Sequence, residues 1–147
     1  MAYKVIVVGT DGSARASRAV EEAMSFAEQV GGELHVVRVV HPAVEAGYVE
    51  SKSGQLVIDR VREDMAVADE RLVGEADRRG VSVVIHNPGG GDPADTLIDM
   101  AQSVNADLIV VGNRGIKSLT RFLQPNVPNK VAHRSVCSVL IVNTGEG

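Results

Sequence analysis

The amino-acid sequence predicts a single α/β domain, residues 1–147, in which a doubly wound parallel sheet is covered by helices on both faces. Three observations support this fold class. Short apolar runs alternate with helical patterns along the chain. Hydrophobic residues make up 44% of the 147 residues but aromatic residues only 3%, so the core must consist mainly of aliphatic side chains. The length fits one domain, and no linker or repeat divides it.

Five short segments are predicted to be strands, because they are rich in Val, Ile and Leu and are bounded by turn residues. The first four are each followed by a loop and a helical pattern. We therefore expect the strands to run parallel and to be joined by right-handed crossovers. The predicted strands are Lys4–Val8, Glu33–Val40, Val81–His86, Leu108–Val111 and Val139–Val142.

The first predicted helix spans Ala14–Val30, where apolar residues recur every three or four positions and Gly31-Gly32 supplies a stop. The second spans Leu56–Arg79 and ends at Gly80. Between them, the polar segment His41–Gln55 lacks periodicity and is predicted to be a mobile loop at the ligand edge of the sheet. The expected apolar face of the second helix consists of Val57, Val61, Met65, Ala68, Leu72 and Ala76.

The third predicted helix, Pro93–Ser103, has a proline in its first turn, and we expect Asp92 to be its N-cap. The fourth spans Val127–His133, with Asn126 as the expected N-cap. Both helices therefore carry a start signal in addition to their apolar residues.

The segment after the fourth predicted strand has features of an anion-binding loop. Gly112 and Gly115 lack a Cβ atom, so backbone N–H groups near them can approach a ligand closely. Charge supports this interpretation, because 18 of the 19 acidic residues occur up to Asp107 and the other is Glu146. The chain is therefore predicted to have a locally cationic region around this loop. The Lys and Arg residues between those two positions are Arg114, Lys117, Arg121, Lys130 and Arg134.

In a doubly wound sheet, ligands bind beyond the carboxyl ends of the strands, where neighbouring crossovers leave in opposite directions. This edge should bring Asp11, after the first strand, close to Gly112 and Gly115. Asp11 could accept hydrogen bonds from a ribose hydroxyl or a base amine; alternatively, Asp11 or Ser13 caps the first helix. We interpret Gly89–Gly91, after the third strand, as a flexible turn rather than a binding device.

Several classes of function lack their sequence signatures. A net charge of -4 argues against general binding to nucleic acid or to an anionic membrane. The chain shows no signal peptide and no apolar run of transmembrane length, so we expect a cytoplasmic protein. It has neither a GxxxxGK[ST] loop nor a GxGxxG motif after a strand, which leaves P-loop hydrolysis and dinucleotide redox chemistry unsupported.

The titratable residues do not predict a catalytic or metal centre. The four histidines lack the HxxxH or Cys/His spacing of metal ligands. We interpret Cys137, the only cysteine, as a small packing residue. His133 lies four residues before it, but the helix should end between the two and no third group orients such a pair. No base that could activate water is evident, so no catalytic residue is assigned.

Three motifs together resemble the universal stress protein family over nearly the whole chain. They are VIVVGTDGS near the start, GDPADTLIDMAQSVNADLIVVGNRG in the second half and SVLIV near the end. The resemblance implies a Rossmann-like, five-stranded parallel sheet in the order 3-2-1-4-5 with about four helices. It also implies a homodimer that pairs the last strands, here through Val139, Leu140, Ile141 and Val142.

Many members of this family bind ATP or a related adenine nucleotide through a Gly-x2-Gly-x9-Gly-Ser/Thr pattern, and Gly112 and Gly115 match its first half. The resemblance implies that this chain binds ATP, AMP or cyclic AMP, with Mg²⁺ as an accompanying ion, and that any ATP hydrolysis is slow. It further implies that Asp11 and Val39 face the ribose and the adenine. The nucleotide-binding residues that it implies are Gly9, Thr10, Asp11, Val39, Gly112, Arg114, Gly115, Asn126 and Val127.

The second half of that pattern differs, because Pro125 and Asn126 stand where nucleotide-binding members have glycine and a hydroxyl residue. Proline has no backbone N–H and fixes φ at about −65°, so one donor and any positive-φ geometry are lost. Losing one charge-assisted hydrogen bond to phosphate lowers affinity roughly ten- to a hundred-fold. The Asn126 amide can still donate, and nearby Arg and Lys side chains can offset part of the deficit.

Three functional interpretations are consistent with these features. The first is a stress-response regulator that binds an adenine nucleotide. The second is a dimeric interaction module of the same fold that has lost ATP binding, with Pro125-Asn126 marking the loss. The third is an enzyme that uses Cys137 or Asp11 covalently.

Overall fold

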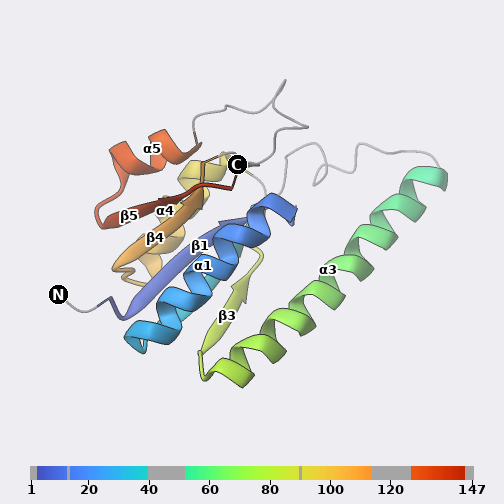
Figure 1. The fold of residues 1–147 in the computed structure, drawn as a ribbon. Coiled ribbons are helices and arrows are strands. Elements are labelled where there is room, and N and C mark those ends of the chain that lie inside the picture. Colours follow the sequence, from blue (N-terminus) through green and yellow to red (C-terminus); the bar gives the residue numbers. More distant parts are fainter. Residues whose placement is uncertain (1–2, 13, 40–51, 90, 114–126, 145–147) are drawn as a thin grey trace.

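A computed structural model of the chain describes residues 3–12, 14–39, 52–89, 91–113 and 127–144 (Figure 1). Five strands within these residues form one parallel sheet in the order β3-β2-β1-β4-β5. The predicted fold class and strand order are therefore confirmed. The strands are β1 (Val5–Thr10), β2 (Glu33–Arg38), β3 (Val83–His86), β4 (Leu108–Gly112) and β5 (Ser138–Val142).

Four helices in the described part of the chain cover the two faces of the sheet. In Figure 1, α1 and α3 lie on one face, and α4 and α5 lie on the other. Most predicted boundaries agree with the structure within two residues. The largest difference is at α3, which begins at Lys52. The last residues of the predicted loop His41–Gln55 are therefore helical. The rest of that loop lies outside the described residues. The helices are α1 (Ala14–Val30), α3 (Lys52–Arg79), α4 (Pro93–Ser103) and α5 (Val127–Arg134).

The core consists of two apolar layers, one on each face of the sheet. Ile6 and Val8 of β1 pack toward α1, whereas Val7 between them packs toward α4. All three side chains are fully buried. Burial on both faces explains why the strands appear in the sequence as continuous aliphatic runs rather than as alternating patterns.

The helix boundaries have the local causes that the sequence predicts. Gly31 and Gly80 follow α1 and α3 with φ of +68°, a left-handed conformation that favours glycine. The Asp92 carboxylate accepts a hydrogen bond from the Asp95 backbone N–H at 3.0 Å, which confirms Asp92 as the N-cap of α4. The predicted cap Asn126 lies outside the described residues.

Helix α3 is attached to the body by apolar contacts near its carboxyl end and by polar contacts of two arginines. Leu72 and Ala76 pack against the core under α1, but Ala68, on the predicted apolar face, is exposed. The side chains of Val57 and Val61 lie outside the described part. Toward Lys52 the helix diverges from the sheet (Figure 1). Although α3 is 28 residues long, neither it nor another helix of the described segments has an apolar stretch that could cross a membrane.

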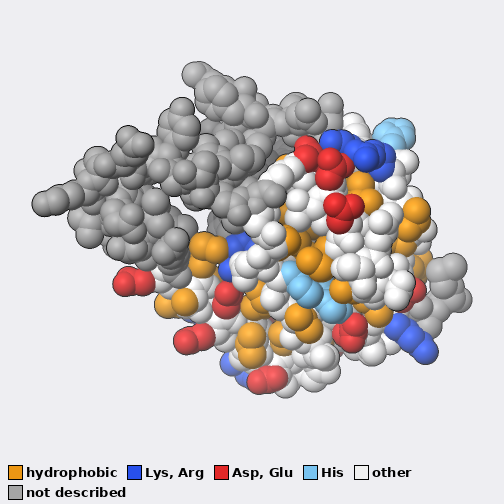
Figure 2. Space-filling view, turned by 180° about the vertical axis from the view of Figure 1, so that it is seen from behind, with side chains coloured by type: hydrophobic (Ala, Val, Ile, Leu, Met, Phe, Trp, Pro, Cys, Tyr) orange, Lys and Arg blue, Asp and Glu red, His pale blue; other side chains and the backbone are white. Residues whose placement is uncertain are grey.

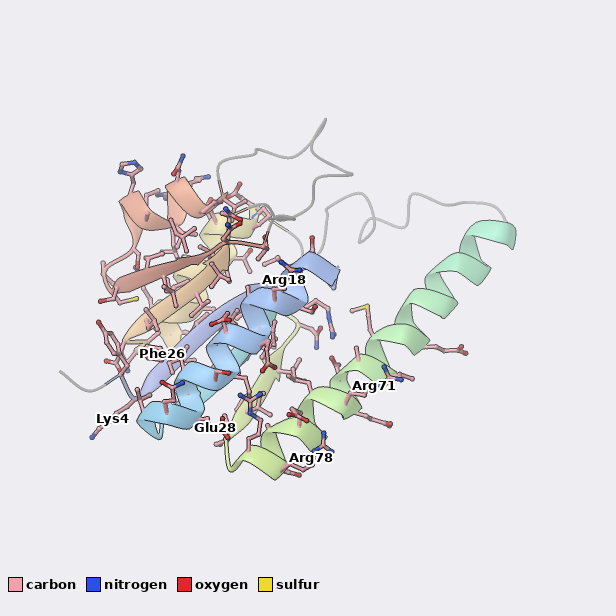
Figure 3. The ribbon with its side chains drawn as sticks, in the orientation of Figure 1. Lys4, Arg18, Phe26, Glu28, Arg71 and Arg78 are labelled. Carbon is pink, nitrogen blue, oxygen red and sulfur yellow. The ribbon has the colours of Figure 1, made fainter. Side chains whose placement is uncertain are left out.

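Two arginines connect α3 to its neighbours. Arg79, in the last turn, donates hydrogen bonds to three side chains of α1, and Arg38, at the end of β2, forms an ion pair with Asp69. Figure 3 draws the side chains of α1 and α3 and labels Glu28 of α1. The partners of Arg79 on α1 are Glu21, Ser25 and Glu28, at 2.8 to 3.2 Å.

Candidate functional site

The carboxyl ends of β1, β2 and β4 meet at one edge of the sheet. β1 pairs in parallel with β2 on one side and with β4 on the other. Helix α1, which follows β1, lies on one face of the sheet, and helix α4, which precedes β4, lies on the opposite face. The crossover connections therefore separate between β1 and β4. Val8 of β1 is in register with Val110 of β4. Thr10 lies two residues after Val8, and Gly112 lies two residues after Val110. The sheet therefore brings the end of β1 and Gly112 together, as predicted for the ligand edge.

Thr10 organises the turn after β1. Its hydroxyl oxygen accepts a hydrogen bond from the Gly12 backbone N–H at 3.1 Å, and its carbonyl oxygen accepts one from the Val39 N–H at 2.8 Å. Gly12 has φ of +83°, which residues with a Cβ atom rarely adopt. The turn therefore fixes the place of Asp11, beside the end of β2.

Gly9 and Val39 lie on the α4 side of this edge. A Cβ atom on Gly9 would lie 2.9 Å from both δ carbons of Leu97, so glycine allows α4 to pack directly against β1. Val39 is 9% exposed and belongs to the same apolar cluster as Leu97. Gly9 thus has a packing role in addition to the ligand contact that the resemblance implies.

Strand β4 ends at Gly112, which is in register with Val142 of β5. The buried Thr144 side chain lies against it, since a Cβ atom on Gly112 would be 2.9 Å from Thr144 Cγ2. The backbone N–H of Asn113 donates to the Val142 carbonyl oxygen at 2.9 Å. The first glycine of the predicted anion loop is therefore packed against the segment that follows β5.

The remainder of that predicted loop lies outside the described residues. This applies to Arg114, Gly115 and Asn126 among the predicted nucleotide-binding residues, and to Pro125. Val127 is the first residue of α5 and is partly buried against the apolar cluster of the α4 face. The predicted site residues that the structure brings to one edge are Gly9, Thr10, Asp11, Val39 and Gly112.

The two described members of the predicted cationic region are paired with acidic residues. Lys130 Nζ lies 3.0 Å from Asp92 Oδ2 and 3.7 Å from Asp95 Oδ1. Arg134 donates to Asp95 Oδ1 at 2.6 Å. The prediction of a cationic region needs correction at these two positions, because acidic residues at the start of α4 fold against α5 and balance their charge.

Asp92 links the start of α4 to α5. Burial acts to raise the pKa of its carboxyl group, but the hydrogen bond from the Asp95 backbone N–H and the contact with Lys130 outweigh it, so this pKa is lowered. The carboxylate is therefore ionised at neutral pH, where it caps one helix and holds the other.

A hydrogen-bonded pair of histidines, which the sequence did not predict, lies on the α4 face of β2 and β3. His35 Nδ1 lies 2.8 Å from His86 Nε2, and His35 Nε2 lies 2.8 Å from Glu33 Oε1. Burial, and then the neighbouring His35, lower the pKa of His86. Figure 2 shows histidine side chains near the middle of this face. Only the register of β2 with β3 brings the pair together, so no local spacing could have revealed it.

Three further features of the described residues bear on a metal or catalytic site. Within them, no group of three or more His, Cys, Asp or Glu is arranged to hold a metal ion. Cys137 is half-buried, with its Sγ 3.3 Å from the Ser135 hydroxyl. A hollow of about 370 Å³ beside α4 contains none of the predicted nucleotide-binding residues in its lining. It is lined by Pro88, Gly89, Thr96, Asp99, Met100 and Ser103.

Comparison with known proteins gives concordant matches over nearly the full chain. Residues 2–143 match the model of the universal stress protein family. A universal stress protein of Mycobacterium tuberculosis (strain H37Rv) is 32% identical over 152 residues, which cover 97% of this chain and 98% of the relative.

Two solved structures of similar proteins contain an adenine nucleotide. One, a universal stress protein in complex with cAMP, is 32% identical and has a TM-score of 0.69, covering 99% of this chain and 100% of that chain. The other, the universal stress protein from Archaeoglobus fulgidus in complex with dAMP, is 27% identical and has a TM-score of 0.59, covering 96% of this chain and 98% of that chain.

Proposed function

The chain belongs to the universal stress protein family, and on this basis we propose that it is a cytoplasmic stress-response regulator that binds an adenine nucleotide. The observation that carries the proposal is the meeting of the Gly9–Asp11 segment, Val39 and Gly112 at the edge where the crossovers of β1 and β4 separate. The similar proteins in complex with cAMP and dAMP support an adenine nucleotide as the ligand class.

The proposed site has an adenosine end and a phosphate end. The apolar Val39 suits the face of adenine, and the Asp11 carboxylate can accept a hydrogen bond from a ribose hydroxyl. The phosphate end begins at Gly112, where the chain leaves β4. Thr144 fills the space beside Gly112 that a Cβ atom would take, so we assign phosphate binding to backbone N–H groups at and after the end of this strand. Gly9 and Thr10 support the adenosine end; Arg114, Gly115, Asn126 and Val127 complete the proposed phosphate end.

The identity of residue 125 bears on which nucleotide is preferred. Pro125 has no backbone N–H to offer a phosphate, and a triphosphate needs more donors than a single phosphate does. We therefore expect cAMP and AMP to bind more tightly than ATP, with or without Mg²⁺.

Isothermal titration calorimetry with cAMP, AMP and ATP tests this proposal. Replacing Pro125-Asn126 by Gly-Ser should tighten ATP binding at least about tenfold while changing the cAMP affinity less. If none of the three nucleotides produces heat at millimolar concentration, the chain is instead the interaction module that has lost nucleotide binding.

We also propose a homodimer formed through β5. This strand lies at an edge of the sheet, and its Leu140 and Ile141 side chains are 38% and 43% exposed. An edge strand with exposed apolar side chains favours pairing with a second copy. Sedimentation velocity should detect a dimer that Ile141→Lys converts to monomer. Val84→Lys is the matched control, because Val84 is also 43% exposed but lies on β3 at the opposite edge.

A further inference from the structure

Asn113, the first residue after β4, is joined to residues 142–144 by both its backbone and its side chain. Its backbone N–H donates to the Val142 carbonyl oxygen at 2.9 Å, and its side-chain oxygen accepts from the Thr144 backbone N–H at 2.9 Å. Two longer contacts of 3.4 Å link the same side chain to the Thr144 hydroxyl and to Asn143 Oδ1. The side chain of Asn113 therefore bridges the ends of β4 and β5.

Thr144 is buried although β5 ends two residues before it. Its exposed fraction is 2%, and its Cγ2 atom lies where it would be 2.9 Å from a Cβ atom on residue 112. Gly112 therefore leaves the space that Thr144 occupies, and Asn113 provides the hydrogen bond that holds Thr144 there. Packing and hydrogen bonding act together on the point where the chain leaves β4.

We propose that Asn113 is a positioning residue for the nucleotide site: by anchoring to Asn143 and Thr144, it fixes the backbone at Gly112 where the phosphate end begins. This inference rests on the proposed function. Backbone groups bind a ligand more tightly when they are held in place before it arrives, because less conformational freedom is lost on binding. An asparagine suits this position because one planar amide supplies both an acceptor and donors. Asn113 acts through Gly112 and does not itself contact the ligand.

Hydrogen exchange in the ligand-free protein tests the anchor. In Asn113→Ala the Thr144 backbone N–H loses its acceptor, and we expect its exchange to accelerate at least about tenfold. The amide of Ile109, in the middle of β4, should exchange as in the wild type. Equal exchange of the Thr144 amide in the two proteins would overturn the anchor, whether or not any nucleotide binds.

Calorimetry with cAMP tests the consequence for the site. Asn113→Ala should raise the dissociation constant about tenfold, and a chain that ends at Val142 should show the same loss because it lacks Asn143 and Thr144. The two changes combined should bind cAMP no more weakly than either alone, since both remove one connection. A chain that ends at Thr144 is the matched control and should bind cAMP like the full chain.

The outcomes separate this inference from the proposed function. If the wild type binds no adenine nucleotide, the proposed function fails, the positioning role fails with it, and exchange still decides the anchor. If the wild type binds cAMP and Asn113→Ala binds it equally well, the positioning role alone is overturned. Additive losses in the combined variant would also overturn it, because they would indicate two independent effects.

Discussion

The amino and carboxyl ends of the strands each contain a closely packed glycine, but the neighbours of these glycines differ. At the amino ends, a Cβ atom on Gly32 would lie 2.9 Å from the carbonyl oxygen of Tyr3 and 3.1 Å from that of Lys4. At the carboxyl ends, one on Gly112 would lie 2.9 Å from a methyl group of Thr144. Backbone neighbours cannot shift without disturbing the β ladder, whereas a side chain can rotate. The edge that holds the candidate site is therefore the more adjustable of the two.

Two aspartates show the same difference between the amino and carboxyl ends of the strands. At the amino ends, the Asp107 carboxylate accepts hydrogen bonds from the backbone N–H groups of Lys4 and Val5, both at 2.9 Å, and so fixes the start of β1. At the carboxyl ends, Asp92 caps α4 and pairs with Lys130 of another helix. One aspartate fixes the sheet, while the other orients helices around the candidate site.

The largest effect is expected at the rigid edge. Gly32→Ala should lower the free energy of unfolding by about 3 kcal/mol, because the new methyl group meets backbone carbonyl oxygens that cannot move aside. Gly31→Ala is the control, since it strains a φ of +68° but meets no atom within 4 Å, and it should cost about 1 kcal/mol. Chemical denaturation measures both. Equal losses would show that steric contact at Gly32 is unimportant.

A smaller effect is expected at the adjustable edge. Gly112→Ala should lower the free energy of unfolding by about 1.5 kcal/mol, since the new methyl group displaces a side chain only. Adding Thr144→Ser removes the displaced methyl group, so the double variant should be more stable than Gly112→Ala alone. Denaturation of the two proteins decides this, and a double variant that is less stable would place the conflict in the backbone.

The smallest effect is expected for the link between α4 and α5. Asp92→Asn keeps a good N-cap but removes the charge facing Lys130, and should cost about 0.5 to 1 kcal/mol at pH 7. Because the pKa of Asp92 is lowered on folding, its contribution is present above the unfolded value near 3.9 and is lost as pH falls through the folded value. Denaturation at pH 7, 5 and 3 should show the two proteins converging in acid. A constant difference would exclude the charge as its cause.

Local patterns were sufficient to predict most of the fold. The limits of α1, Ala14–Val30, agree with the prediction because an apolar stripe and a glycine stop are both encoded within the helix and its next residues. The start of α3 was placed too late, because the residues before Leu56 are polar and carry no apolar periodicity. The first residues of α3 are therefore helical without the apolar periodicity on which the prediction relied.

Local patterns could not predict contacts between residues that lie far apart in the sequence. The predicted cationic region included Lys130 and Arg134, but Asp92 and Asp95, at the start of an earlier helix, form ion pairs with them. The placement of Thr144 against the loop glycine depends likewise on the register of β4 with β5. Residue types indicated where a ligand site should lie, whereas only the assembled sheet reveals which side chains are already engaged.

The attachment of α3 makes one part of this protein responsive to ionic strength. Arg79 binds Glu21 and Glu28, whose side chains are 61% and 43% exposed, so dissolved ions can screen these pairs. Ala19 and Ala23 of α1, like Ala76 near the end of α3, are fully buried, and screening does not weaken apolar burial. Concentrated sodium chloride should therefore weaken the polar part of the attachment of α3, while its buried contact at Ala76, the sheet and α1 stay in place.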